Sequence, residues 1–187
     1  QIYQLSENYK DDGYFINYYR NNKERIDIKR CIKLLKIHKS YKDKNLYILD
    51  AIWNLSIELN KRYLFVKKYL KTDTNNSIIF LKTLNLALNS INYQEIRGRD
   101  SLGVVVNVTF KNDNKTFQFI KKNIDKSNYH ILKKNKSYSV FAIIFKTFNI
   151  YGSLGDNSKK IINIISKNKI LNYILKNNKI LKSYILA

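Results

Sequence analysis

The 187-residue sequence has one cysteine, no proline and no methionine. A single cysteine, Cys31, excludes an internal disulfide and a cysteine-rich metal site. No apolar run reaches the roughly 18 residues that a membrane-spanning helix needs, and no secretory hydrophobic region opens the chain. Because 44% of the residues are hydrophobic, the chain can still bury a core. These features predict a reduced, soluble protein of the cytoplasm, with no membrane partner.

The charge is strongly of one sign, with 35 Lys and Arg against 14 Asp and Glu and a formal net charge of +21. Such an excess usually indicates nucleic acid or an anionic surface as a partner. Codon usage offers another cause, because the abundant Lys, Asn, Ile and Tyr have AT-rich codons and the scarce Arg, Ala and Gly have GC-rich ones. Lysines also occur in every segment, which argues against one organised nucleic-acid-binding face. A basic nucleic-acid-binding module is kept as the alternative function.

Apolar spacing of the helical kind predicts most of the first half of the chain. The pattern predicts helices over about 24–39, 45–70 and 77–92, whereas residues 1–22 are rich in Tyr and Asn and show weak periodicity. A further helix is predicted over about 157–178, after the strands. Residues 1–80 are therefore taken as a helical insert or extension of unknown role.

The periodicity changes to that of strands after residue 101. The valine-rich residues 102–110 and the alternating residues 139–150 predict two long strands, and residues 116–120 are predicted to pair back as a hairpin. Residues 121–137 are polar and predict an exposed connection, while residues 182–186 predict the start of another strand. Helices followed by strand, strand, helix and strand favour the α+β class.

Four of the five glycines fall in two short clusters, and two of the six arginines, Arg97 and Arg99, lie in the first of them, residues 94–103. Arg97 carries a planar fork suited to a carboxylate or a backbone carbonyl, and Gly98 allows close backbone approach. Asp100 could pair with an arginine, and Ser101 could hydrogen-bond the turn. The alternative is a charged turn that only holds itself together.

The second cluster, residues 151–157, predicts a turn between a strand and a helix. A helix N-terminus that follows glycines can hold an anion. The pattern is neither a P-loop nor a dinucleotide-binding fingerprint, and Asp156 or Ser158 could instead cap the helix. Capping is the interpretation that we favour. No metal site is predicted, because His38 and His130 lie far apart and lack cysteine partners.

Taken in order, the two clusters resemble class II glutamine amidotransferase domains. Residues 95–103 (EIRGRDSLG) are similar to the pattern Leu-Glu-x-Arg-Gly-x-Asp-Ser-x-Gly of the glutamine–fructose-6-phosphate aminotransferase family, and residues 154–157 (LGDN) are similar to a segment in a longer branch of it. The resemblance implies a partial αββα sandwich of the amino-terminal-nucleophile hydrolase type over 81–187. It also implies glutamine as substrate, no cofactor, and ammonia transfer to a sugar-phosphate isomerase domain of the same, homo-oligomeric polypeptide, which makes glucosamine 6-phosphate.

The resemblance also implies the site residues. Arg97 would form one wall of the active site, and Arg99 stands where other members have tyrosine. The family's nucleophile is an amino-terminal cysteine with its own α-amine as base, whereas Cys31 is internal. We therefore read the chain, which begins at Gln1 and ends on an apolar run, as an internal piece that is inactive alone, with a non-catalytic remnant as the alternative. The implied substrate-binding residues are Arg97, Gly98, Arg99, Asp100, Ser101 and Gly103, and the implied structural turn is Gly155, Asp156 and Asn157.

Overall fold

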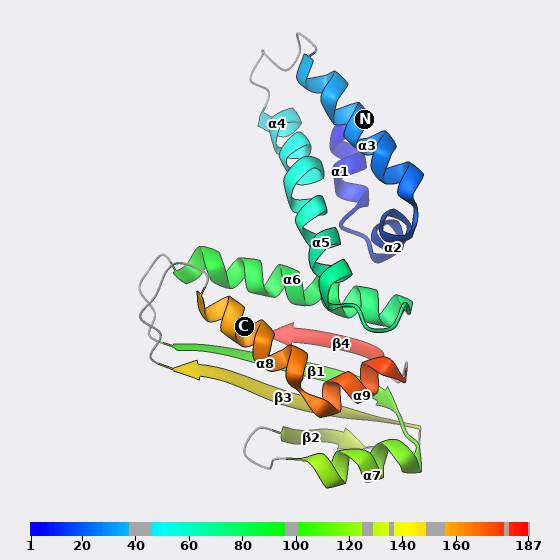
Figure 1. The fold of residues 1–187 in the computed structure, drawn as a ribbon, viewed down its shortest axis with the longest axis vertical. Coiled ribbons are helices and arrows are strands. Elements are labelled where there is room, and N and C mark those ends of the chain that lie inside the picture. The colour runs from blue at the N-terminus through cyan, green and yellow to red at the C-terminus, as the bar shows by residue number, and fades with distance from the viewer. Residues whose placement is uncertain are drawn as a thin grey trace. The chain divides into compact units, whose positions relative to one another are not determined.

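The chain forms two compact units, residues 1–68 and residues 69–187 (Figure 1). The boundary of 80/81 predicted from the sequence falls inside a helix of the second unit. A computed structural model describes residues 1–37, 46–95, 101–124, 129–134, 137–148, 156–177 and 180–186.

The first unit is helical over its described residues. The helices predicted over 24–39 and 45–70 are confirmed where the structure describes them, while residues 38, 39 and 45 lie outside the described residues. The second contains a π-helical turn in which Ser56 Oγ donates to the Ile52 carbonyl at 2.6 Å. Residues 1–22, whose apolar periodicity is weak, form two short helices. The second is capped by Asp11, whose carboxylate accepts from the amides of Gly13 and Tyr14. The elements are α1 (Ile2–Asn8), α2 (Asp12–Arg20), α3 (Asn22–Ile37), α4 (Leu46–Trp53), η2 (Asn54–Glu58) and α5 (Leu59–Tyr69).

The second unit is an α+β structure around a four-stranded sheet with the order β2-β3-β1-β4. Each pair of neighbouring strands is antiparallel. One helix connects β1 to β2 and two connect β3 to β4, so the connectivity after α6 is β-α-β-β-α-β. The elements are α6 (Asn75–Glu95), β1 (Ser101–Lys111), α7 (Asn114–Asn123), β2 (Tyr129–Lys134), β3 (Tyr138–Phe148), α8 (Asp156–Lys167), α9 (Lys169–Lys176) and β4 (Ile180–Leu186).

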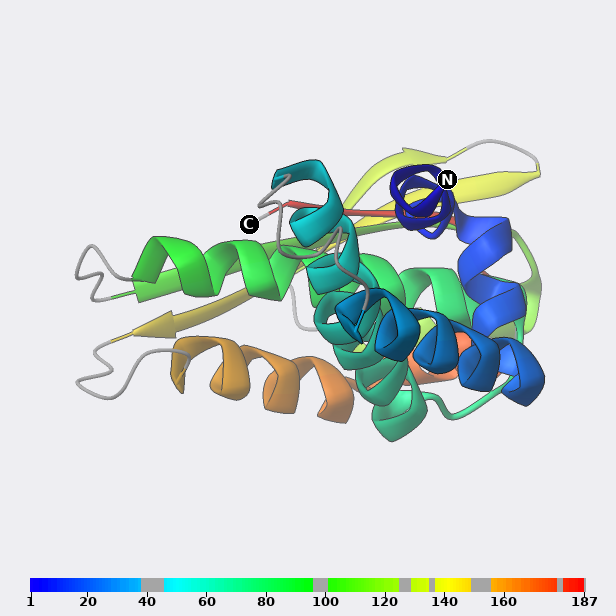
Figure 2. The ribbon, with the colours of Figure 1, turned by 90° about the horizontal axis from the view of Figure 1, so that it is seen from above.

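One face of this sheet is covered by helices. α6 contacts β4, α8 contacts β3 and β1, and the two helices contact each other (Figure 2). On β1 the side chains alternate: Val104, Val106 and Val108 are fully buried, whereas Val105 and Asn107 on the opposite face are partly exposed. The apolar core of the unit therefore lies between the helices and one side of the sheet.

The structure corrects three expectations about the second half of the chain. Residues 116–120, predicted as a returning strand, lie in α7, because the Asp113 carboxylate accepts from the Thr116 amide at 2.8 Å and caps a helix there. Residues 121–137, predicted as an exposed connection, contain β2, whose pairing with β3 shifts register between Ile131 and Lys133. The helix predicted over 157–178 is two helices, divided at Asn168.

Candidate functional site

The described residues next to the two sequence clusters lie at the same end of the sheet. In the antiparallel register, Ser101 at the start of β1 pairs with Phe148 at the end of β3. α6 ends at Glu95, just before the first cluster, and α8 begins at Asp156, at the end of the second. Sheet pairing thus brings together segments that are about 50 residues apart in the chain, because antiparallel partners run in opposite directions.

Buried hydrogen bonds join the elements at this end. Thr147 Oγ1 of β3 lies 3.2 Å from Asn157 Oδ1 of α8, and Ser158 Oγ of α8 donates to Asn92 Oδ1 of α6. The Leu88 carbonyl of α6 is also 3.4 Å from Ser158 Oγ. Buried side-chain polar atoms are usually satisfied in this way, so these contacts hold the described ends of α6, β3 and α8 together.

The predicted site residues are placed as follows. Arg97, Gly98, Arg99, Asp100 and Gly155 lie outside the described residues. Ser101 is the first residue of β1, and Gly103 is exposed on β1 opposite Lys146. A Cβ built on Gly103 would meet nothing within 4 Å, so packing among the described residues does not require glycine there. Asp156 begins α8 and pairs with Lys159 at 2.8 Å, while Asn157 is buried.

Sequence reasoning did not single out Asn92 or Thr147. Thr147 continues the buried face of β3 after Ile143 and Phe145, so a polar residue in an apolar series was the available signal. Asn92 gave no local signal, because its partner Ser158 is 66 residues away. The end of β4 lies at the same end of the sheet, since Leu186 pairs with Val105.

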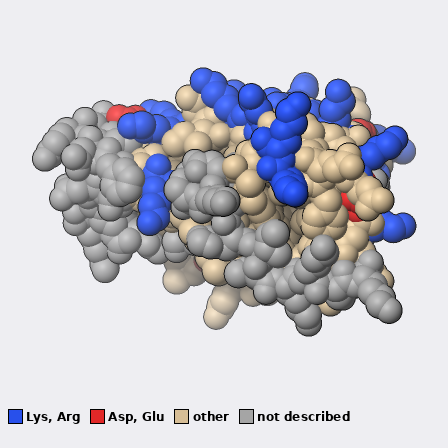
Figure 3. Space-filling view, turned by 90° about the horizontal axis from the view of Figure 1, so that it is seen from below, with Lys and Arg blue, Asp and Glu red and all other residues tan. Residues whose placement is uncertain are grey.

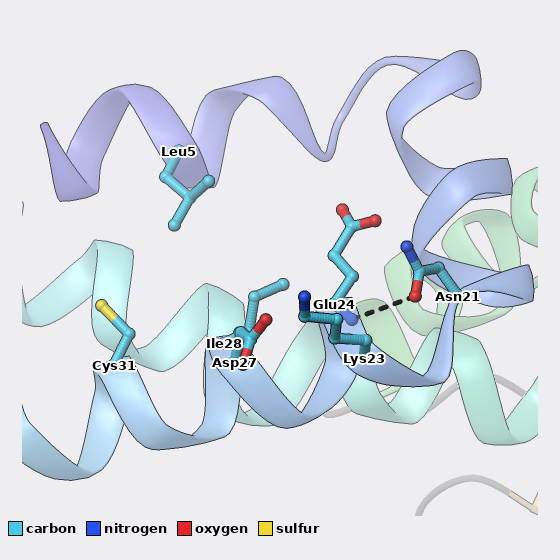
Figure 4. Close-up of a pocket in the computed structure, with 7 residues that line it drawn as sticks. All are labelled: Leu5, Asn21, Lys23, Glu24, Asp27, Ile28 and Cys31. Atoms are coloured by element: carbon cyan, nitrogen blue, oxygen red, sulfur yellow. Dashed lines mark hydrogen bonds between the residues drawn. The ribbon is translucent and has the colours of Figure 1, made fainter.

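A groove of about 350 Å³ lies between α1 and α3 in the first unit (Figure 4). Glu24 stands at one end, where its carboxylate accepts from the Tyr9 hydroxyl and from Asn17 Nδ2, and Asn21 Oδ1 accepts from the Glu24 amide at 3.2 Å. Cys31 lies on α3 at the other end with its thiol exposed. The groove is lined by Leu5, Asn21, Lys23, Glu24, Asp27, Ile28 and Cys31.

Glu24 connects this groove to a cluster of tyrosines, of which Tyr9 donates a hydrogen bond to it. Burial, followed by the hydrogen bond to Glu24, raises the pKa of Tyr9, and burial raises the pKa of Tyr18 beside it. Both phenols are therefore neutral near pH 7, and Tyr9 acts as a donor to Glu24. The described residues contain no group of three or more His, Cys, Asp or Glu that could hold a metal ion, so the groove offers no metal centre there.

Within the part of the chain that the structure describes, no helix has the length and apolar character needed to cross a membrane. The hydrogen bonds and the strand pairing described above make the end of the sheet where α6, β1, β3 and α8 meet the candidate site.

No protein-family model matches the chain, and searches of the curated proteins and of the solved structures also find no match.

Proposed function

We propose that residues 81–187 are part of a class II glutamine amidotransferase domain. This domain would release ammonia from glutamine and pass it to a sugar-phosphate isomerase domain of the same polypeptide, which makes glucosamine 6-phosphate. The observation that carries the proposal is the pairing of Ser101 with Phe148, because it brings the flanks of both family-like clusters to one end of the sheet. An active site assembled from separate loops needs this convergence.

The layering of the second unit also supports the proposal. The family's sandwich packs two sheets face to face with helices outside. The second unit has a helical layer on one face of its sheet, while the other face carries the partly exposed Val105 and Ile144 and the exposed Leu186. A sheet with helices on one face and a partly exposed second face is compatible with one half of such a sandwich.

The proposed chemistry divides between this chain and residues outside the given sequence. An amino-terminal cysteine would attack the side-chain amide carbon of glutamine, form a thioester and release ammonia, and water would then hydrolyse the thioester. Its α-amine suits the role of base, since its reference pKa is about 7.7–8.0. Arg97 would form part of the wall beside this nucleophile. Because the one cysteine of the given sequence, Cys31, is internal, these residues alone are expected to hydrolyse no glutamine.

The family's glutamine-carboxylate clamp, the arginine of a His-Thr-Arg-Trp-Ala motif, would follow directly after Ala187. The end of β4 supports this proposal, because Leu186 pairs with Val105 near the start of β1. The coding sequence around the chain provides the first test. An upstream in-frame Met-Cys-Gly and a downstream His-Thr-Arg-Trp would support the proposal, whereas an intact gene with neither would exclude it.

An assay of the longer gene product provides the second test. Arg97→Ala should lower kcat/KM for glutamine by roughly 10–100-fold, because displacement of an active-site wall misaligns the reacting groups. Arg20→Ala is the matched control, since Arg20 is an exposed arginine of α2 in the first unit. Equal activity of the two variants would contradict the role of Arg97, and glutamine hydrolysis by the isolated chain would contradict the assignment of the nucleophile.

A further inference from the structure

One stripe of α7 combines two lysines and an aromatic ring. Lys115, Phe119 and Lys122 are spaced i, i+4 and i+7, so they lie along one side of the helix. Both lysines are exposed and Phe119 is half-buried. The buried residues of α7 are Thr116 and Ile120, which face the core instead. The stripe is therefore a surface feature of the helix.

A stripe with the same spacing lies on α9. Lys169, Tyr173 and Lys176 are again at i, i+4 and i+7, with both lysines exposed and the ring half-buried. The two helices contact each other, and the rings of Phe119 and Tyr173 stack with their centroids 4.0 Å apart and an interplanar angle of 11°. The two stripes consequently meet at the stacked rings, and on each helix one lysine precedes the ring and one follows it.

The four lysines 115, 122, 169 and 176, here called the lysine frame, have no carboxylate on their own helices. From Asn157 to Ala187 the sequence contains no Asp or Glu at all. At the start of α7 the Asp113 carboxylate accepts from the amide and hydroxyl of Thr116. Figure 3, seen from the side on which α7 lies, shows many lysine and arginine atoms and few carboxylates on the described surface. The frame is thus a local concentration of positive charge.

Codon bias does not explain this distribution. An AT-rich genome raises lysine along the whole chain, and lysines do occur in every segment. Carboxylates, in contrast, are uneven: eight of the 14 fall in residues 1–68, and the four strands contain none. A bias that acts on all codons alike accounts for the many lysines but not for the low density of Asp and Glu in the second unit.

We propose that the lysine frame binds the phosphate backbone of single-stranded RNA, with the edge of the Phe119–Tyr173 pair against a base. Clustered lysines bind such backbones by releasing condensed counterions, and aromatic rings beside them supply contacts that any base can make. An anionic bilayer fits less well, because binding to it needs exposed apolar residues that insert, and the exposed residues of α7 and α9 are Lys, Asn and Gln. The proposal uses no residue of the amidotransferase site and stands or falls separately.

Fluorescence anisotropy of the whole chain with a labelled oligouridine of about 20 nucleotides tests the proposal. Four phosphate contacts predict a slope of about −2.8 for log affinity against log salt, which is a loss of about 50-fold between 50 and 200 mM. Replacing all four lysines of the frame by glutamine should lower affinity at least about tenfold and flatten the slope toward zero. Tyr173→Leu should weaken binding about fivefold with the slope unchanged.

The matched control replaces Lys23, Lys29, Lys33 and Lys36 of α3 by glutamine. These lysines are also exposed, and the change in net charge is the same. Affinity within about twofold of the unmodified chain is expected, and circular dichroism checks that both quadruple variants fold. Equal weakening by both variants would overturn the proposal, because binding would then follow net charge. It is also overturned if the oligouridine does not bind, or if only phosphatidylserine vesicles bind through the frame.

Discussion

Tyr9 shows how one residue ties the short helices of the first unit together. Its side chain is 4% exposed, its hydroxyl donates to Glu24 of α3, and its ring meets Tyr18 of α2 edge-on with centroids 5.5 Å apart. Arg25 adds a second link, since its guanidinium donates to the carbonyls of Tyr18 and Tyr19 and lies 4.6 Å from the centroid of the Tyr63 ring. Side-chain hydrogen bonds and ring contacts thus supplement the apolar core of α1, α2 and α3.

The raised pKa of Tyr9 makes the stability of this unit depend on pH. The folded state holds the phenolic proton more tightly than the unfolded state, whose pKa is about 10. The contribution is therefore fully present below about pH 10 and is lost as pH rises toward the folded pKa. Between about pH 9.5 and pH 11, the urea midpoint of unfolding, followed through Trp53, the only tryptophan, should therefore fall.

Tyr9→Phe is the variant that isolates this contribution. It should lower the free energy of unfolding at pH 7 by about 0.5–1.5 kcal/mol, because Glu24 loses a donor. It should also reduce the alkaline slope by up to about 1.4 kcal/mol per pH unit, the value for one proton. Tyr3→Phe is the control, since Tyr3 is half exposed. An unchanged alkaline slope in Tyr9→Phe would show that Tyr9 does not carry the effect.

At the scale of elements, caps decide where helices begin in the second unit. Asn168 separates α8 from α9, and its Oδ1 accepts from the Leu171 amide at 2.9 Å. The apolar pattern runs on through this position, with Ile165 and Ile170 buried on either side. A continuous pattern and a divided helix are compatible because a cap changes the backbone direction while the buried side chains still face the core.

Removing this cap should cost a measurable part of the stability. Asn168→Ala should lower the free energy of unfolding by about 1 kcal/mol, because the first-turn amides of α9 lose their acceptor. Asn168→Asp keeps an acceptor and should stay near the original stability. Chemical denaturation followed by circular dichroism measures both, and equal loss in the two variants would contradict the capping role.

Sequence patterns predicted the elements that have a long, regular periodicity. α6, β1 and β3 were found in this way, and the α+β class followed from them. The short helix α7 was mistaken for a strand because its cap at Asp113 lay within a run that also reads as a turn. β2 was missed because its lysines interrupt the apolar pattern, and its pairing with β3 is a tertiary contact.

The candidate site was predictable only in its parts. Glycines marked both clusters and arginines marked the first, since both residue types are rare in this composition. That the described residues beside both clusters share one end of the sheet depends on the register of Ser101 with Phe148, and the bond of Ser158 to Asn92 depends on helix packing. Neither is encoded in local periodicity, because both join segments far apart in sequence.

At the scale of the whole molecule, net charge and exposed apolar surface have opposite effects on association between copies of the chain. The chain carries +21, whereas the sheet of the second unit presents a face with Tyr184 and Leu186 exposed by 52% and 62%. Both side chains lie on β4, an edge strand of the described sheet. Edge strands with apolar side chains invite pairing with another chain, and like charges resist such pairing.

Salt should shift this balance toward association. The Debye length shortens from about 10 Å at 0.1 M to about 3 Å at 1 M, so the sedimentation coefficient should rise with salt. Leu186→Lys should suppress the rise, because it adds charge to the edge strand and removes apolar surface. Leu34→Lys is the matched control, since Leu34 of the first unit is also exposed. Suppression by both variants would point to net charge rather than to β4.

The uncovered side of the sheet therefore affects how the purified protein should be handled. Dilute buffers of low ionic strength keep separate copies in solution through mutual repulsion, whereas concentrated salting-out conditions screen that repulsion and strengthen apolar burial. A preparation that is monodisperse in one buffer would then turn cloudy in the other, with no change in how each copy is folded.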